Sequence, residues 1–275
     1  MASTWAPNQD GPDHPHNAPE PSFARINDYW LDGSDHTEAD VEIATRITMC
    51  APHIPYLVRE LRHLLGRMVR ELHGLGIRQF LDLGSGIPNV QHIHQVVAEL
   101  SADCRVVYVD SDPDVASRSQ ATLRDVPFAR FISTDIRQPA EVLADPQLRE
   151  ILDLSEPVAV FLLGTLQEIA DEDDPRQLVA DYFARLSQGS YLALSHFGKG
   201  DQQLASGLDM FGRMFQQPPP VRMRDTDELR AILGDLSVVE PGIVRMPLWH
   251  PSDDQDMGQN AEHVPVHVAL GVKNQ

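Results

Sequence analysis

Alternating apolar residues that run into a pair of glycines mark the most informative stretch of the chain. Phe80-Leu81-Asp82-Leu83 leads into Gly84-Ser85-Gly86, and an amphipathic segment follows over residues 90–100. This order predicts a buried strand, a tight turn and a helix. Glycine at positions 84 and 86 leaves out two Cβ atoms that would otherwise keep a ligand away from the main chain.

A second apolar segment completes this unit. Residues 105–110 predict a strand that ends in Asp110. Because parallel strands end at the same edge of a sheet, Asp110 is expected beside the glycine turn, where a carboxylate holds a ribose diol. The pattern therefore predicts a nucleoside-binding α/β unit.

The remaining apolar segments extend the same sheet. Further strands are predicted over 128–133, 157–163 and 190–197, with a closing antiparallel pair over 236–246 and 264–272. Residues 198–224 show no such pattern and are expected to be irregular. Their Met210, Phe211, Met214 and Phe215 either line a substrate pocket or form the apolar stripe of a core-facing helix, at a spacing of three to four residues.

Helical periodicity precedes the first strand. Residues 1–21 are rich in Pro, Asn, Asp and His and predict a flexible leader. Amphipathic helices are expected over residues 22–30 and 38–49, and a longer one over 56–73. Together, residues 22–76 are expected to form a lid over the nucleoside site. Residues 77–275 are then expected to form the catalytic core.

The turn itself distinguishes between two kinds of nucleoside site. A dinucleotide fingerprint requires G-x-G-x-x-G, and the third glycine position is Asn89 here. An acid before the glycines, Asp82, is instead typical of D-L-G-x-G turns that hold S-adenosylmethionine.

Three motifs in order resemble one family. They are the lid motif ARINDYWLDG over 24–33, the turn over 80–88, and the segment VYVDSDP over 107–113. With them the chain resembles class I methyltransferases and, more narrowly, the actinobacterial S-adenosyl methyltransferase family formerly labelled DUF574. The resemblance implies a Rossmann-like α/β fold with a seven-stranded, mostly parallel sheet whose last strand is antiparallel, plus an N-terminal helical lid. It also implies S-adenosylmethionine as cofactor and S-adenosylhomocysteine as product.

The residues expected to contact the cofactor lie in the lid motif and at the carboxyl ends of the strands. They are Arg25, Tyr29, Gly33, Asp82, Gly84, Ser85, Gly86, Asp110, Ser111, Asp135, Ile136, Leu163, Gly164 and Thr165. Some have a structural alternative. Tyr29 is equally a core aromatic, Arg25 an ion-pair partner on the surface, and Asp135 a loop acid that caps the turn before Pro139.

Methyl transfer is an in-line displacement, so the protein mainly aligns the reacting groups. A general base is needed only if the acceptor loses a proton at attack. Glu168, after the fourth strand, and His196, at the end of the fifth, are the two candidates. Glu168 is alternatively an acid in the first turn of a helix, and His196 a buried histidine with satisfied hydrogen bonds.

Charge and composition narrow the acceptor and the location. The formal net charge of −19 disfavours nucleic acid and favours a neutral or cationic small molecule. No apolar run approaches the roughly 20 residues of a membrane span, and no signal peptide is evident, so a cytoplasmic protein is expected. Cys50 and Cys104 fit no metal-ligand spacing and are expected to be buried, reduced thiols.

Two other functions remain open at this point. An NAD-linked oxidoreductase is opposed by Asn89 and by the antiparallel end of the sheet. A non-catalytic protein that binds S-adenosylmethionine would share every motif described above. Nothing in the chain indicates its oligomeric state.

Overall fold

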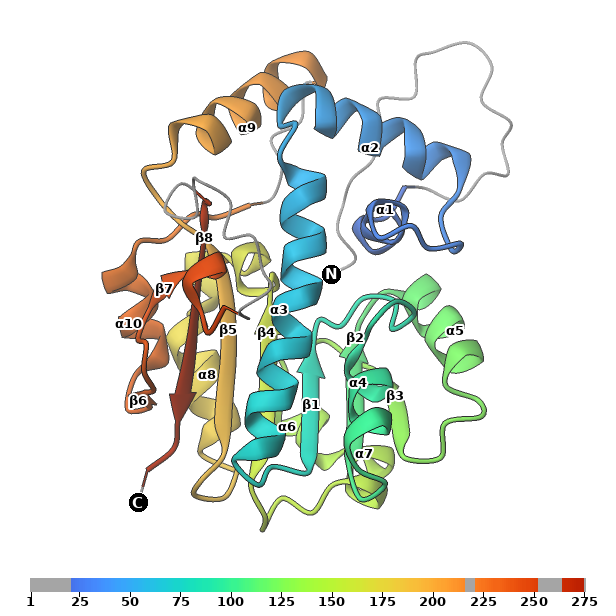
Figure 1. Ribbon diagram of the computed structural model, residues 1–275, viewed down its shortest axis with the longest axis vertical. Helices are drawn as coiled ribbons and strands as arrows, with labels where there is room; N and C mark the ends of the chain where they lie inside the picture. Colours follow the sequence, from blue (N-terminus) through green and yellow to red (C-terminus); the bar gives the residue numbers. More distant parts are fainter. Residues whose placement is uncertain (1–20, 216–220, 252–263, 275) are drawn as a thin grey trace.

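The computed structural model describes residues 21–215, 221–251 and 264–274, so nearly all of the expected leader lies outside the described residues. Its centre is a sheet of eight strands in the order β3-β2-β1-β4-β5-β8-β6, with β7 also paired to β8 (Figure 1). The strands are β1 Gln79–Leu83, β2 Arg105–Asp110, β3 Ala129–Ser133, β4 Val158–Leu163, β5 Tyr191–Phe197, β6 Ser237–Val238, β7 Val244–Arg245 and β8 Val266–Val272.

The predicted fold class is confirmed, with a correction at one end of the sheet. Strands β1 to β5 are parallel, and β8 runs antiparallel to β5. Residues 236–246, expected to be one strand, form the two short strands β6 and β7. Gly242 lies between them with φ 93°, and its N–H donates to the carbonyl of Val239 at 2.9 Å, so a turn interrupts the strand. The sheet therefore has eight strands instead of seven.

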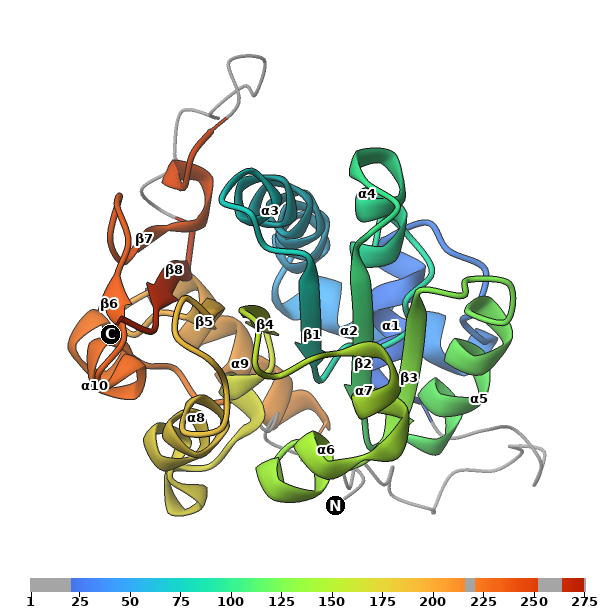
Figure 2. The ribbon, with the colours of Figure 1, turned by 90° about the horizontal axis from the view of Figure 1, so that it is seen from below.

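Helices cover both faces of the sheet. One face carries α3 Ile54–Gly74, α4 Ile93–Leu100 and α5 Pro113–Thr122, and the other carries α6 Pro139–Ala144, α7 Pro146–Ile151, α8 Pro175–Phe183 and α10 Thr226–Leu233. Figure 2 separates α3 and α4 from α6, α8 and α10 across the sheet. In β4, Ala159 and Phe161 face the first group, while Val160 and Leu162 face the second. This two-sided burial explains the continuous apolar run of β4.

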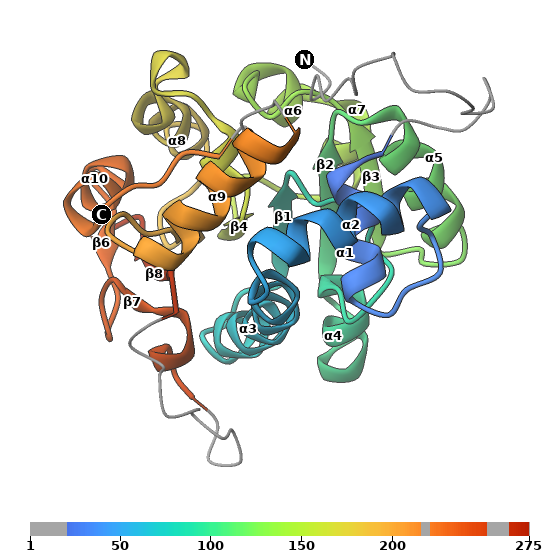
Figure 3. The same ribbon diagram turned by 90° about the horizontal axis from the view of Figure 1, so that it is seen from above.

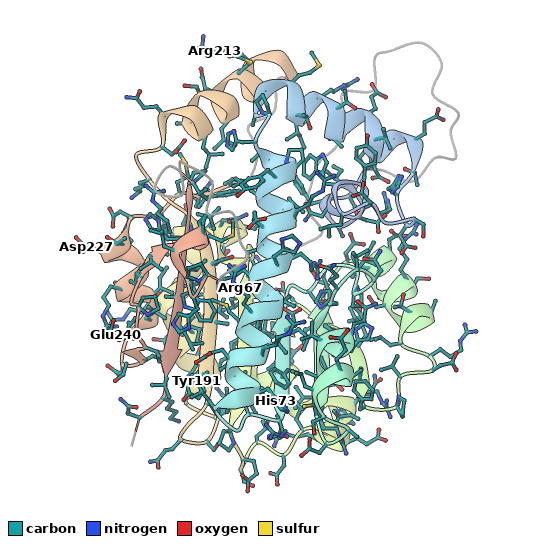
Figure 4. All side chains as sticks on the ribbon, viewed as in Figure 1. Arg67, His73, Tyr191, Arg213, Asp227 and Glu240 are labelled. Atoms are coloured by element: carbon teal, nitrogen blue, oxygen red, sulfur yellow. The ribbon has the colours of Figure 1, made fainter. Side chains whose placement is uncertain are left out.

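A further group of helices lies above the carboxyl edge of the sheet. It consists of α1 Phe23–Trp30, α2 Glu38–Cys50 and α9 Gln202–Phe215 (Figure 3). The helix α9 corrects the expectation that 198–224 is irregular. It packs closely on α2, since a Cβ on Gly207 would lie 2.9 Å from the carbonyl oxygen of Cys50. Arg213 projects from the outer side of α9 (Figure 4). The side chains of Phe211, Met214 and Phe215 lie outside the described residues.

Local capping explains where several of these helices begin. Ser22 accepts a hydrogen bond from the N–H of Arg25 at the start of α1, and Thr37 forms a capping box with Asp40 at α2.

Both cysteines are buried and free, as predicted. Among the helices of the described residues, none combines the length and apolar character needed to span a membrane.

Candidate cofactor and acceptor site

The glycine turn after β1 lies where β1 and β4 separate, the place at which the strand order reverses. Gly84 and Gly86 have φ values of 72° and 60°, a region that favours glycine. The side chain of Thr165, which follows β4, fills the space that a Cβ on Gly84 would need. Thr165 also donates from Oγ1 to the carbonyl of Leu83 at 3.0 Å. Open α/β sheets bind ligands at such a reversal.

The carboxylate of Asp110 is fixed beside this turn. Its Oδ2 accepts the N–H of Gly86 at 3.0 Å, and its Oδ1 accepts the N–H of Asp112 at 3.0 Å. Burial raises the pKa of Asp110, and these backbone hydrogen bonds partly oppose that rise. Ser111, the next residue, is exposed. The carboxylate of Asp110, the predicted ribose-binding acid, is therefore held beside the glycine turn by two backbone hydrogen bonds.

Asp82 supports the turn from below. Its side chain is buried, and burial raises its pKa to about 7, with attraction to Arg62 opposing and repulsion from Asp110 adding to the rise. The Nε2 atom of His92 lies 3.7 Å from Asp82 and 3.3 Å from the carbonyl oxygen of Ser85. Asp82 and His92 thus hold the turn through its interior.

Arg62 is a candidate site residue that the sequence pattern did not reveal. It lies on α3, is partly exposed, and feels the charge of Asp82. Burial lowers its pKa, and attraction to Asp82 opposes this. Within the part of the chain that the structure describes, its guanidinium has no hydrogen bond or ion pair. Nothing in the local sequence separates Arg62 from the other arginines of α3.

The lid residue Arg25 forms a buried ion-pair cluster. Its Nε donates to Asp40 at 2.7 Å and its guanidinium to Asp114, in α5, at 2.5 Å. Only 2% of Arg25 is exposed. The expected ion pair is thus present, but it is buried instead of lying on the surface, and it connects the lid to the core. A cofactor contact of Arg25 stays a prediction.

The turn after α1 is attached to the glycine turn through Asn89. Its amide donates to the carboxylate of Asp28 and, at 3.0 Å, to Asp35. A Cβ on Gly33 would overlap the carboxylate of Asp28, which explains why this position needs glycine. Tyr29 is partly buried, edge-on to a neighbouring histidine ring.

The lid also reaches the cofactor turn directly. A Cβ on Gly86 would lie 3.9 Å from the Cβ of Ala24, in α1. On the other side, a Cβ on Gly164 would lie 3.3 Å from Leu61, in α3. Leu163, which ends β4, is partly buried against the same core cluster. The ends of β1 and β4 are thus covered by α1 and α3.

Asp135 and Ile136 follow β3. Asp135 is paired with Arg137 at 2.5 Å, and hydrogen bonds from Arg137 lower its pKa to about 2. Ile136 is buried, and its carbonyl accepts the hydroxyl of Tyr182 at 2.8 Å. The pair thus has a rigid position at the sheet edge, and its contact with adenine stays a prediction.

Glu168 combines exposure with desolvation. It ends the short 3-10 turn η1, Leu166–Glu168, directly after Thr165, and its side chain is exposed. Surrounding protein nevertheless raises its pKa to about 7, and repulsion from Asp110 adds to the rise. The carboxyls of Glu168 and Asp110 are therefore close enough for their charges to interact.

His196 lies in the interior instead. It is 0% exposed, its Nδ1 is 2.9 Å from the carbonyl of Phe197, and its Nε2 is 2.9 Å from the guanidinium of Arg224. Since an arginine only donates, Nε2 accepts and Nδ1 carries the proton. Burial lowers the pKa of His196 to about 4. The satisfied-histidine alternative therefore fits, and His196 is not available as a base.

The fold and the site geometry define a nucleoside-binding α/β protein of the methyltransferase type. The family model described as S-adenosyl methyltransferase matches residues 11–274, and the chain belongs to that family. S-adenosylmethionine is therefore its cofactor, and methyl transfer its activity. The NAD-linked and non-catalytic alternatives are set aside.

Solved structures agree with this assignment. A DUF574 family protein from Streptomyces avermitilis shares 34% identity and a TM-score of 0.84, covering 92% of this chain and 98% of that one. A methyltransferase candidate from Thermobifida fusca shares 32% identity and a TM-score of 0.84, covering 93% and 96%. The plantazolicin methyltransferase BamL, solved with S-adenosylhomocysteine, shares only the fold, at 9% identity and a TM-score of 0.54, covering 92% and 96%. No curated protein matches the chain.

Proposed function

We propose that the crevice above the carboxyl ends of β1, β2 and β4 binds S-adenosylmethionine and presents its methyl group to a small-molecule acceptor. The observation that carries this proposal is the carboxylate of Asp110, held by the N–H of Gly86 at the glycine turn. The acids around the crevice, Asp110 and Glu168, favour a positively charged sulfonium and disfavour a pyrophosphate.

The residues of this chain fit the parts of the cofactor. Asp110 would hold the ribose, Ser111 would lie beside it, and the edge of Asp135 and Ile136 would hold the adenine. The unpaired guanidinium of Arg62 fits the carboxylate of the methionine end. The cofactor would approach the main chain of the glycine turn and of the end of β4, at Gly84, Ser85, Gly86, Leu163, Gly164 and Thr165.

The lid and the core would have separate roles in this site. Residues 22–76 would form the N-terminal helical part, in which α1 and α2 act as the lid and α3 packs on the sheet, with Arg25, Tyr29 and Gly33 setting the position of the lid. Residues 77–275 would form the core, with α9 completing the cover. A covered site excludes water from the reacting groups, which favours alignment of the acceptor with the methyl group. Asp82 would act beneath the turn without touching the ligand.

Glu168 is the residue that would take a proton from the acceptor. When bound, S-adenosylmethionine supplies an electrophilic methyl group on a charged sulfur. A carboxylate with a pKa of about 7 is well matched to accept a proton near neutral pH. The acceptor would then carry a dissociable proton on oxygen or nitrogen, and would be neutral or cationic. A cytoplasmic location and the exclusion of nucleic acid stay predictions from the sequence.

Calorimetric titration with S-adenosylmethionine tests the site. Asp110→Ala should raise the Kd at least tenfold, because the ribose loses its acceptor. Asp103→Ala is the matched control, since Asp103 lies at the opposite end of β2, and its Kd should stay within twofold. An unchanged Kd in Asp110→Ala would reject the assignment of the ribose site.

A further inference from the structure

Arg224 is a buried arginine whose side chain is bonded entirely to the protein. Only 4% of the residue is exposed. Its guanidinium donates to the carbonyls of Leu166 and Ile169, each at 2.9 Å, to Nε2 of His196 at 2.9 Å, and to the carboxylate of Asp171 at 2.7 Å. A buried arginine with this many acceptors is costly to replace and fixes the groups around it.

The two carbonyls that Arg224 holds bracket Glu168 in the chain. Leu166 O lies two residues before Glu168 and Ile169 O one residue after it, and the N–H of Arg222 donates to the carbonyl of Gln167 at 2.7 Å. The segment 222–224 therefore holds the main chain of η1 along most of its length.

The other side of the same turn is held by the cofactor loop. Thr165, one residue before η1, is bonded to Leu83 and fills the space beside Gly84. Glu168 thus stands on a short turn between the glycine turn and segment 222–224. Neither attachment uses the carboxylate of Glu168, so that group stays free to face the crevice.

We propose that Arg224 is a positioning residue that holds the η1 main chain so that Glu168 faces the acceptor. This inference rests on the proposed role of Glu168. His196 helps to hold Arg224 in place, because its neutral imidazole offers Nε2 as an acceptor to the guanidinium. Asp171, at the rim, balances the charge of Arg224.

Charges that face Glu168 are few, which makes its carboxyl a usable reporter. Desolvation by the surrounding protein and repulsion from Asp110 raise its pKa. Loosening η1 would admit water to the carboxyl of Glu168. The smaller desolvation would lower its pKa toward the ordinary value of about 4.3.

The test is a carboxyl NMR titration of protein labelled with 13C at the glutamate side chains, with Glu168→Gln assigning the resonance. The pKa of Glu168 should be about 7 in the unchanged protein. Arg224→Met should lower it by about one unit or more. Arg222→Met is the matched control, since that side chain makes no hydrogen bond within the described residues, and the pKa should stay unchanged. The Kd of S-adenosylhomocysteine should stay within twofold in both variants.

Arg224→Lys is the second variant, measured as well in case Arg224→Met does not fold. Lysine keeps the charge but cannot reach both carbonyls as a planar fork does, so an intermediate decrease is expected. An unchanged pKa of Glu168 in the folded Arg224 variants overturns the proposal. A pKa near 4.3 already in the unchanged protein instead overturns the proposed role of Glu168 as a base, so the two failures are distinguishable.

Discussion

Thr165 occupies the space that a side chain on Gly84 would require. The methyl group of Thr165 lies less than 3.0 Å from where a Cβ on Gly84 would be built, and its hydroxyl donates to the carbonyl of Leu83, the residue before that glycine. The contact connects the ends of β1 and β4 at the reversal of strand order. The shape of the glycine turn thus depends on Thr165, which lies 82 residues after Leu83 in the chain.

Gly84→Ala should therefore weaken cofactor binding. The new Cβ overlaps Thr165 and must adopt a φ of 72°, so either the turn or η1 is displaced. We expect the Kd of S-adenosylmethionine to rise more than tenfold by calorimetry. Gly76→Ala is the control, because Gly76 has a φ of 95° but nothing within 4 Å of a Cβ. It should cost about 1 kcal/mol of stability through strain and leave binding unchanged.

Asp82→Asn should stabilise the protein in a pH-dependent way. The folded-state pKa of Asp82 is raised to about 7, whereas the unfolded chain releases this proton near about 3.9. The folded protein thus binds more protons between these values, and its unfolding free energy falls as pH rises through them. Asparagine does not ionise, so Asp82→Asn removes this fall in the unfolding free energy.

The test is urea denaturation without cofactor, which gives the unfolding free energy of both proteins. The two conditions to be compared are pH 5 and pH 8. The gain from Asp82→Asn should be larger at the higher pH, by up to a few kcal/mol at about 1.4 kcal/mol per pKa unit. Asp135→Asn is the control, since its pKa of about 2 lies below this range. An equal gain at both pH values contradicts the raised pKa of Asp82.

Arg25→Met should loosen the lid. It leaves Asp40, which is 0% exposed, without its arginine, and the expected loss is about 3 kcal/mol. Hydrogen exchange over residues 23–50 should become faster than in the core strands. Arg118→Met, which removes a more exposed pair with Asp35 and Asp114, should cost less than about 1 kcal/mol. Equal losses in the two variants would contradict the role of Arg25.

Glu168→Gln should reduce turnover once an acceptor is found among phenols and amines. The loss in kcat/KM should be about 10²- to 10⁴-fold, because a general base is removed. Activity of the unchanged enzyme should rise with pH through about 7, since Glu168 must lose its proton to act. Glu172→Gln, at an exposed acid nearby, should keep both the rate and the pH profile. Release of S-adenosylhomocysteine gives the rate.

The sequence predicts those parts of the fold that rest on local patterns. The positions of the five parallel strands and the turn at Gly84 follow from alternation, from glycine and from capping residues such as Asp112. The segment of α9 was expected to be irregular because it is rich in Gln and Met and precedes the prolines at 218–220, although the helical spacing of its apolar residues left a helix open as an alternative.

The site is less predictable because its partners are far apart in the chain. Arg224 lies 58 residues from Leu166, and Asn89 lies 61 residues from Asp28. A single sequence contains no sign that such residues meet. His196 shows the converse: a histidine at a strand end was a reasonable base, and only its packing partner Arg224 reveals its structural part.

The attachment of the lid has a consequence for the traffic of ligands. Polar contacts from Arg25, Asp28 and Asp35 of the lid run to residues 89–118, on the nucleoside side. At the opposite seam, α9 meets α2 through the close fit at Gly207. If the lid opened on the nucleoside side to exchange cofactor and product, the ion pairs of Arg25 and Asp35 would have to break.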